Sequence, residues 1–167
     1  MILWNSFDKN EIFLLIFNVI AYMIVLLMPK KFTRTAGLLF FFWGVTIGML
    51  YDFTIGGGLL DYYKSNDSNQ YEIFDVVYCF LYGAFGYIFF YFYEKLNINK
   101  KTFIFYTLAW AITGVAFQFV FMKLDIITLQ NGYKLPYSFV VFLITQTISG
   151  VYYEILRGKE RVLLKGR

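Results

Sequence analysis

The sequence predicts an all-α fold: a polytopic bundle of five transmembrane helices in a single integral membrane domain, residues 1–167. Two observations predict it. Hydrophobic residues make up 59% of the chain and charged residues 16%, which is too apolar for a soluble domain of this size. The chain also contains five apolar runs long enough to cross a hydrocarbon core of ~30 Å, which takes about 20 helical residues. These runs are Ile12–Met28, Ala36–Ile55, Ile73–Tyr93, Thr102–Met122 and Tyr137–Leu156.

The first three spans have recognisable ends. The segment before the first span lacks the basic region of a signal peptide, and no small-residue cleavage site follows the span, which ends at Pro29–Lys31. We therefore expect this span to stay in the mature protein. Gly56–Gly58 ends the second span, and the polar segment 64–69 is typical of a flexible turn. The third span contains the nearly unbroken apolar run 85–92, which does not fit the alternating pattern of a β-barrel strand.

A short connection with two turn signals separates the fourth and fifth spans. Asn131-Gly132 favours a tight turn, and Pro136 favours the first turn of a helix, so we expect the fifth span to begin there. No internal repeat at a fixed period is visible along the chain. A transporter built from inverted repeats is therefore disfavoured.

The distribution of Lys and Arg predicts how the chain crosses the membrane. Eleven of the 15 Lys and Arg residues follow the first, third and fifth spans, and four lie on the opposite side. Basic segments stay in the cytoplasm, so we expect the N-terminus outside and the C-terminus cytoplasmic, in a multi-pass protein of the cell membrane. The odd number of spans also requires the two termini to lie on opposite sides of the membrane. The formal net charge of +4 is then a topology signal, and we expect the lipid bilayer, and no nucleic acid, as a partner.

The residue inventory predicts no cofactor and no enzymatic activity. The chain has no histidine and a single cysteine, Cys79, so the usual soft ligands of zinc, haem or iron–sulfur sites are lacking. Calcium or magnesium bound by Asp and Glu oxygens stays open. No pairing of a nucleophile with a base and no catalytic motif is recognisable.

Two carboxylates inside the spans mark a candidate polar pocket. An ionisable group is expensive to bury in a bilayer, so Asp52 in the second span and Asp75 in the third each need a partner. The two spans run in opposite directions, which puts both residues near the outer surface. Tyr78 and Tyr82 follow Asp75 at helical spacing, and Asn18 comes from the first span. We expect these five side chains to share a polar network, although the same groups would also serve as hydrogen bonds between helices.

Glycines at helical spacing mark the expected contacts between helices. Gly44 and Gly48 precede Asp52 on one face of the second span. Gly83 and Gly86 lie on the polar stripe of the third span. Small residues let two backbones approach closely in a membrane, so we expect both faces to pack against another helix and to turn Asp52 inward.

Two functions from different classes fit these features. The first is a non-enzymatic membrane component or accessory subunit, with a membrane protein or a second copy of the chain packed against Gly44 and Gly48. The second is a carrier or receptor for a small solute or ion, with a polar pocket that opens outward near Asp52 and Asp75. Nothing in the sequence identifies the ligand or the partner of either.

A set of short motifs runs from the second span to the fifth: Gly48 with Tyr51-Asp52, an acidic and tyrosine-rich loop, Trp110, and Asn131–Leu135 followed by Ser138. With these motifs the chain resembles a family of small, uncharacterised five-span membrane proteins of endospore-forming, low-GC Gram-positive bacteria. Tyr133 stands where that family usually has tryptophan, and the histidine often found near the inner ends is missing. The resemblance implies architecture and bacterial origin, and no chemistry. The chain length also suits the substrate-binding subunits of energy-coupling-factor transporters, although these usually have six spans.

Overall fold

The structure, a computed structural model, describes residues 7–65 and 72–157, and this part of the chain is mostly helical. It contains five helices that are long and apolar enough to cross a membrane, which confirms the predicted all-α fold. These are α1 (Lys9–Leu27), α2 (Arg34–Ile55), α3 (Ile73–Lys95), α4 (Phe103–Lys123) and α5 (Leu135–Arg157). Of the predicted turn at 64–69, residues 66–69 lie outside the described residues, as does the basic segment that follows the fifth span from residue 158 onward.

Polar caps extend the first two helices beyond their apolar runs. The Asp8 side chain accepts a hydrogen bond from the N–H of Asn10 at 3.3 Å, and the N–H of Asp8 donates to Glu11 at 3.0 Å. Thr33 caps α2, with its hydroxyl oxygen 3.2 Å from the N–H of Ala36. The first N–H groups of a helix need such acceptors, so each helix begins at its cap and not at its first apolar residue.

Two short strands join the connections at one end of the bundle, which we call the strand end. β1 (Tyr63–Ser65) pairs antiparallel with β2 (Ile127–Leu129) and thereby ties the connection between α2 and α3 to the one between α4 and α5. Beside β2, Asn131 and Gly132 both have positive φ, which confirms the predicted tight turn. The opposite end, which we call the basic end, carries Lys30, Lys31, Lys95, Lys100 and Lys101.

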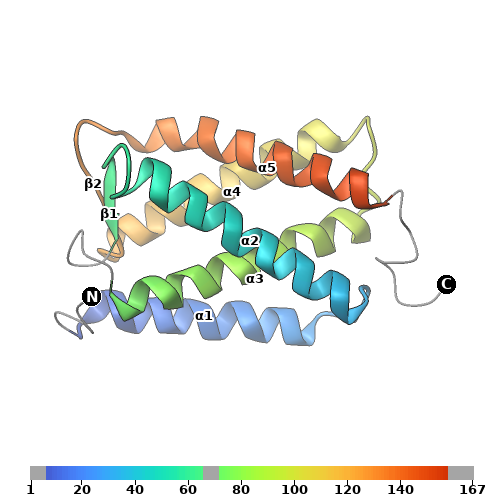
Figure 1. The fold of residues 1–167 in the computed structure, drawn as a ribbon, viewed down its shortest axis with the longest axis horizontal. Helices are drawn as coiled ribbons and strands as arrows, with labels where there is room; N and C mark the ends of the chain where they lie inside the picture. Colours follow the sequence, from blue (N-terminus) through green and yellow to red (C-terminus); the bar gives the residue numbers. More distant parts are fainter. Residues whose placement is uncertain (1–6, 66–71, 158–167) are drawn as a thin grey trace.

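The helices form two groups that face each other (Figure 1). In the first group α3 is central, with α1 packed along it and α2 crossing it, while the second group is the pair α4 and α5. Large aromatic side chains fill much of the space between the groups. Phe85 meets Phe117 with ring centroids 5.0 Å apart, and Phe89 meets Trp110 at 5.5 Å.

The halves α2–β1–α3 and α4–β2–α5 are related by an approximate two-fold rotation about the long axis of the bundle. Both halves run helix, strand, helix, and both begin at the basic end (Figure 1). At the strand end the axis passes through the middle of the antiparallel strand pair. At the basic end the contacts are reciprocal: the hydroxyl of Tyr93 donates to Glu154 at 2.9 Å, and that of Tyr153 donates to Glu94 at 2.7 Å. Among the described helices, α1 stands outside this arrangement.

Glycines allow α2 and α3 to cross in close contact. A Cβ atom on Gly44 would lie 2.8 Å from the Cα of Gly86, and one on Gly86 would lie 2.5 Å from the Cα of Gly44. A Cβ on Gly48 would overlap the ring of Tyr82, and one on Gly83 would overlap a phenylalanine ring of α2. All four glycines singled out in the sequence therefore lie where α2 and α3 meet.

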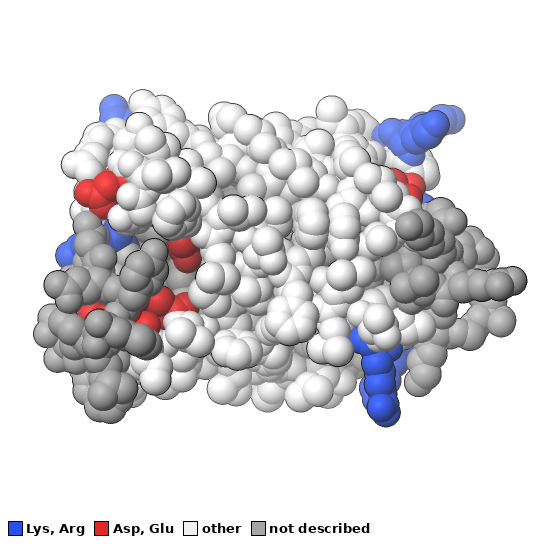
Figure 2. All heavy atoms as spheres, viewed as in Figure 1, with Lys and Arg blue, Asp and Glu red and all other residues white. Residues whose placement is uncertain are grey.

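Charged side chains gather at the two ends of the bundle, and the surface between them on the face shown carries no charged side chains (Figure 2). Every helix presents large hydrophobic side chains outward, among them Leu26, Leu38, Phe80, Phe105 and Val140. An apolar belt between two charged ends matches the hydrocarbon core and headgroup regions of a bilayer. Lipid contact therefore accounts for these exposed side chains in a multi-pass membrane protein.

Candidate functional site

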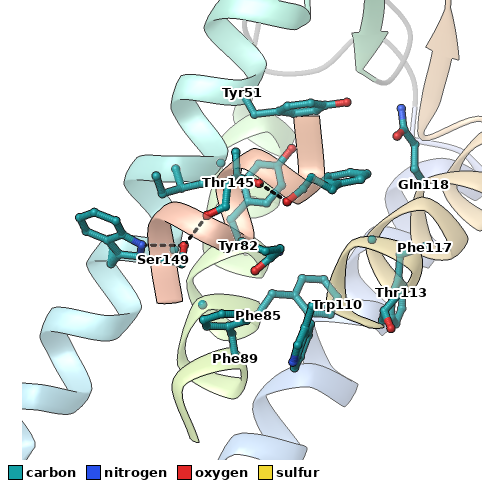
Figure 3. A pocket seen from close by; sticks show the side chains of 18 of the residues that line it. Tyr51, Tyr82, Phe85, Phe89, Trp110, Thr113, Phe117, Gln118, Thr145 and Ser149 are labelled. Carbon is teal, nitrogen blue, oxygen red and sulfur yellow. Dashed lines mark hydrogen bonds between the residues drawn. The ribbon is translucent and has the colours of Figure 1, made fainter. Parts of the chain in front are cut away.

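A cavity of about 150 Å³ lies between the two halves. All four helices α2–α5 contribute to its lining, and aromatic rings form much of its wall (Figure 3). The main rings are those of Trp43, Phe85, Phe89, Trp110, Phe117 and Phe142. Aromatic side chains offer large flat faces, so this wall is suited to a molecule that contains a ring.

Tyr51 of α2 and Gln118 of α4 form a polar side of the cavity, near the strands (Figure 3). Gln118 is 3% exposed and Tyr51 is 7% exposed. In the described part of the chain, neither amide atom of Gln118 nor the hydroxyl of Tyr51 has a hydrogen-bond partner. The Tyr51 hydroxyl lies beside Gln118 and Ser138 without hydrogen-bond geometry to either. A buried polar group without a partner costs about 1–3 kcal/mol, so both side chains are poised to bind a molecule in the cavity.

Several other polar groups along the cavity make hydrogen bonds within the protein. The Nε1 of Trp43 donates to the hydroxyl oxygen of Ser149 at 3.0 Å, and the Ser149 hydroxyl donates to the carbonyl oxygen of Thr145 at 2.8 Å. The hydroxyl of Thr113 donates to the carbonyl oxygen of Ala109 at 2.9 Å. These bonds stabilise the helices and the contact of α2 with α5.

The cavity lies on the approximate two-fold axis. Tyr51 and Gln118 occupy corresponding positions, because each follows the tryptophan of its helix, Trp43 or Trp110, by eight residues. The lining residues of α3 and α5 also correspond: Tyr82, Phe85, Gly86 and Phe89 match Phe142, Thr145, Gln146 and Ser149. Tyr51 and Gln118 are thus the counterparts of each other in the two halves.

Asp52 is held behind the cavity wall by two tyrosines. Its Oδ1 accepts hydrogen bonds from Tyr82, at 3.0 Å, and from Tyr63 of β1. Burial and the nearby Asp52 carboxylate raise the pKa of the Tyr63 hydroxyl well above its ordinary value, so this hydroxyl stays a donor at physiological pH. Tyr82 itself lines the cavity. The carboxylate therefore fixes a wall residue and ties α2, β1 and α3 together.

The other predicted pocket residues lie in different environments. Asp75 caps the start of α3, where its carboxylate accepts the N–H of Glu72 at 2.8 Å. The amide of Asn18 donates to the carbonyl oxygen of Leu14 in its own helix at 2.9 Å. Tyr78 lines the cavity. Within residues 7–65 and 72–157, neither Asp75 nor Asn18 is hydrogen-bonded to Asp52. Of the predicted pocket residues, Tyr82 donates a hydrogen bond to Asp52, and the ring of Tyr78 lies 4.6 Å from that of Tyr82.

Sequence reasoning missed Tyr51 and Gln118 as site residues. A tyrosine near the end of a span is typical of an interfacial aromatic belt, and an amide inside a span is typical of a bond between helices. Neither residue therefore stands out as a site residue in the sequence. Gln118 is the one that could have indicated the site, because a buried amide in a span is costly unless both of its polar atoms find partners.

The chemistry available in the cavity is hydrogen bonding and stacking. Among the residues that the structure describes, no group of three or more His, Cys, Asp or Glu could hold a metal ion. None of the described residues that line the cavity carries a charge. The described lining therefore offers aromatic faces and uncharged hydrogen-bonding groups.

Comparison with known proteins adds no relative to this picture. No protein-family model matches the chain, and no curated protein or solved structure is significantly similar to it. The resemblance to five-span proteins of endospore-forming bacteria therefore stays a prediction.

Proposed function

We propose that this chain is a multi-pass membrane protein that binds a small, uncharged solute in the cavity between its two halves, as a carrier does. The observation that carries the proposal is a pair of buried side chains, Tyr51 and Gln118, that have no hydrogen-bond partner among the described residues and lie on the polar side of an aromatic cavity. In carriers, solute sites commonly lie where two repeats meet near the middle of the membrane. The approximate two-fold axis through the cavity supports the same interpretation.

Contacts between the two halves lie toward both ends of the bundle from the cavity. Ile127 of β2 lines the cavity at the strand end. Towards the basic end, the rings of Tyr93 and Tyr153 lie 4.8 Å apart, one turn beyond the lining residues Phe89 and Ser149. A carrier opens one end at a time, and two halves related by a two-fold axis can rock about a central solute to do so.

The alternative of an accessory subunit has weaker support. Its predicted docking face contains Gly44 and Gly48, and both are buried against α3 of the same chain. A membrane protein partner or a second copy would have to use a different face. No comparable observation in the described residues points to such a face.

We also propose that the strand end faces the outside and the basic end faces the cytoplasm of a bacterial cell membrane, because basic segments stay inside. A fluorescent protein fused after Arg167 should then fluoresce, and alkaline phosphatase fused there should be inactive. Phosphatase fused after Gly132 in a truncated chain should be active, since this turn lies at the strand end. Active phosphatase after Arg167 would contradict the orientation.

Solute binding is tested by filling the cavity. We expect native mass spectrometry of the protein, purified in native lipid discs, to release a bound small molecule. Thr145→Leu should lower the bound amount by about fivefold or more, because extra side-chain carbons would occupy part of a cavity of about 150 Å³.

The matched control is Thr46→Leu. Thr46 is exposed and makes the same kind of local bond, from its hydroxyl to the carbonyl oxygen of Phe42 at 2.8 Å. The same substitution there adds equal bulk toward lipid, so the bound amount should stay the same. Equal release from the two variants would contradict the proposal, as would the absence of a bound molecule in the unchanged protein.

A further inference from the structure

We infer that the cavity recognises an uncharged molecule with a single ring whose edge carries a hydrogen-bond donor beside an acceptor, as in a lactam. This inference rests on the proposed function, because it names the class of solute that the same cavity would take. It depends on three properties of the cavity: the free amide, the lack of charge and the small volume.

The donor and acceptor follow from Gln118. A side-chain amide presents an N–H₂ donor and a carbonyl acceptor side by side, and in Gln118 both are buried without a partner in the described residues. A molecule with an adjacent acceptor and donor satisfies both atoms at once, whereas a molecule with an acceptor alone gives the carbonyl oxygen of Gln118 no partner. The Tyr51 hydroxyl on the same side of the cavity provides one further donor or acceptor.

The lack of charge follows from the lining. The described lining residues include no Asp, Glu, Lys or Arg. The Asp52 carboxylate, which lies behind the cavity wall, already accepts hydrogen bonds from Tyr63 and Tyr82. A charged solute would therefore be buried among aromatic rings without a counter-ion, and that burial is far more costly than the burial of a neutral molecule.

The single ring follows from the volume and the walls. A cavity of about 150 Å³ is the size that accommodates benzene in a protein interior. The rings of Phe85, Phe89 and Trp110 stand around this space, and aromatic pairs gain about 0.5–1.5 kcal/mol beyond the burial of their surface. A flat six-membered ring can therefore stack on the wall while its polar edge meets Gln118.

Three probes that share a six-membered ring test the inference. 2-Pyridone has the donor and the acceptor, N-methyl-2-pyridone has the acceptor alone, and toluene has neither. Binding is measured by equilibrium dialysis against nanodiscs that contain the full chain, with empty nanodiscs of the same lipid as the reference for partition into the bilayer. We expect 2-pyridone to bind at least about tenfold more tightly than N-methyl-2-pyridone, because the methylated probe leaves a buried acceptor unpaired.

Two variants test whether the preference for 2-pyridone depends on the Gln118 amide. Gln118→Leu and the longer, unbranched Gln118→Met should both bring the ratio between the two pyridones close to one, while toluene still binds. The control is Thr46→Val, which removes a hydroxyl from the exposed surface of α2 and should keep the tenfold preference.

The outcomes separate the two proposals. Equal binding of all three probes to the unchanged protein would overturn the ligand class and leave a cavity that binds solutes. Failure of all three, toluene included, would overturn the proposed function as well. If the preference for 2-pyridone persists in both Gln118 variants, a group other than Gln118 binds the polar edge of the probe. That result would overturn the inference.

Discussion

Gly44→Ala is expected to lower the free energy of unfolding by about 3 kcal/mol, because a single methyl group at this position has no room. The Cβ would lie 2.8 Å from the Cα of Gly86, and it would also meet the carbonyl oxygen of Tyr82. Both neighbours are backbone atoms, so α2 and α3 would have to move apart along their crossing. The measurement is unfolding in mixed micelles with increasing denaturing detergent, followed by the loss of helical signal.

The matched control lies on the same helix. A Cβ on Gly37 would meet a ring carbon of Tyr87 at 3.5 Å, which is ordinary contact. Gly37→Ala should therefore change the stability by less than about 0.5 kcal/mol, and the higher helix propensity of alanine favours a small gain. Equal stabilities of the two alanine variants would contradict the close crossing.

A double variant tests whether Gly44 and Gly86 touch each other. Gly86→Ala alone should cost about as much as Gly44→Ala, since the two glycines are mutual neighbours. Once one methyl group has moved the helices apart, the second methyl group has more room and costs less stability. The double variant should therefore cost at least about 1 kcal/mol less than the sum of the single variants, as expected for residues in direct contact. Strict additivity would place the two glycines in separate contacts.

The membrane-spanning helices could be predicted because their length and apolar character are set by the bilayer. Their exact ends could not be predicted from hydropathy alone, since capping groups decide them: α1 begins at Lys9 because Asp8 and Glu11 satisfy its first N–H groups. The strands escaped prediction for a related reason. Each has three residues, and its pairing joins two connections that lie far apart in the chain.

The candidate site could be predicted in part. Depth and helical facing placed Asp52 and Tyr82 in one region, and a hydrogen bond of 3.0 Å joins them in the structure. Asp75 also lies at the expected end, but its position in the first turn of α3 makes a backbone N–H its partner. Asn18 bonds a carbonyl oxygen of its own helix, an alternative that is always open to a short amide side chain. The helix face on which a residue lies does not by itself determine which hydrogen-bond partner its side chain takes.

The two-fold relation between the halves is hidden in the sequence for physical reasons. The connection 56–72 is longer than the connection 124–134, so corresponding residues of the two halves do not recur at one period. The identity of the residues also differs at the cavity, since Tyr51 in one half corresponds to Gln118 in the other. What persists is the tryptophan of the first helix and the Tyr-Glu pair of the second: Trp43 and Trp110, Tyr93-Glu94 and Tyr153-Glu154.

The reciprocal Tyr–Glu bonds join α3 to α5 toward the basic end of the bundle. Tyr93 and Tyr153 are both buried, and each hydroxyl donates to the glutamate that follows the other tyrosine. Arg157 lies 3.5 Å from Glu154 and adds a charge partner at the exposed edge. These contacts hold α3 to α5 where the two halves would separate if the cavity opened toward this end.

Removing both hydroxyls should therefore open the cavity at the basic end. We expect the double variant Tyr93→Phe with Tyr153→Phe to lose about 1 kcal/mol per hydrogen bond, which for two bonds is roughly a thirtyfold shift of an opening equilibrium. The readout is a cysteine placed at Ser149, a buried lining residue one turn from Tyr153, in a Cys79→Ser background. Its rate of reaction with a membrane-impermeant maleimide should rise by about tenfold or more in the double variant.

The control for this experiment is Tyr152→Phe, which removes the hydroxyl of the neighbouring residue and keeps its ring stacked on Trp43 at 3.7 Å. Labelling should stay slow in this variant, because the reciprocal bonds between α3 and α5 remain. Each single variant, Tyr93→Phe or Tyr153→Phe, should give an intermediate rate, since one of the two bonds is still made. If labelling is equally slow in the double variant and in the control, the Tyr–Glu pairs serve packing alone and do not gate the cavity. If the two single variants each reach the full rate, the bonds act as one unit, and the halves separate as soon as either is broken.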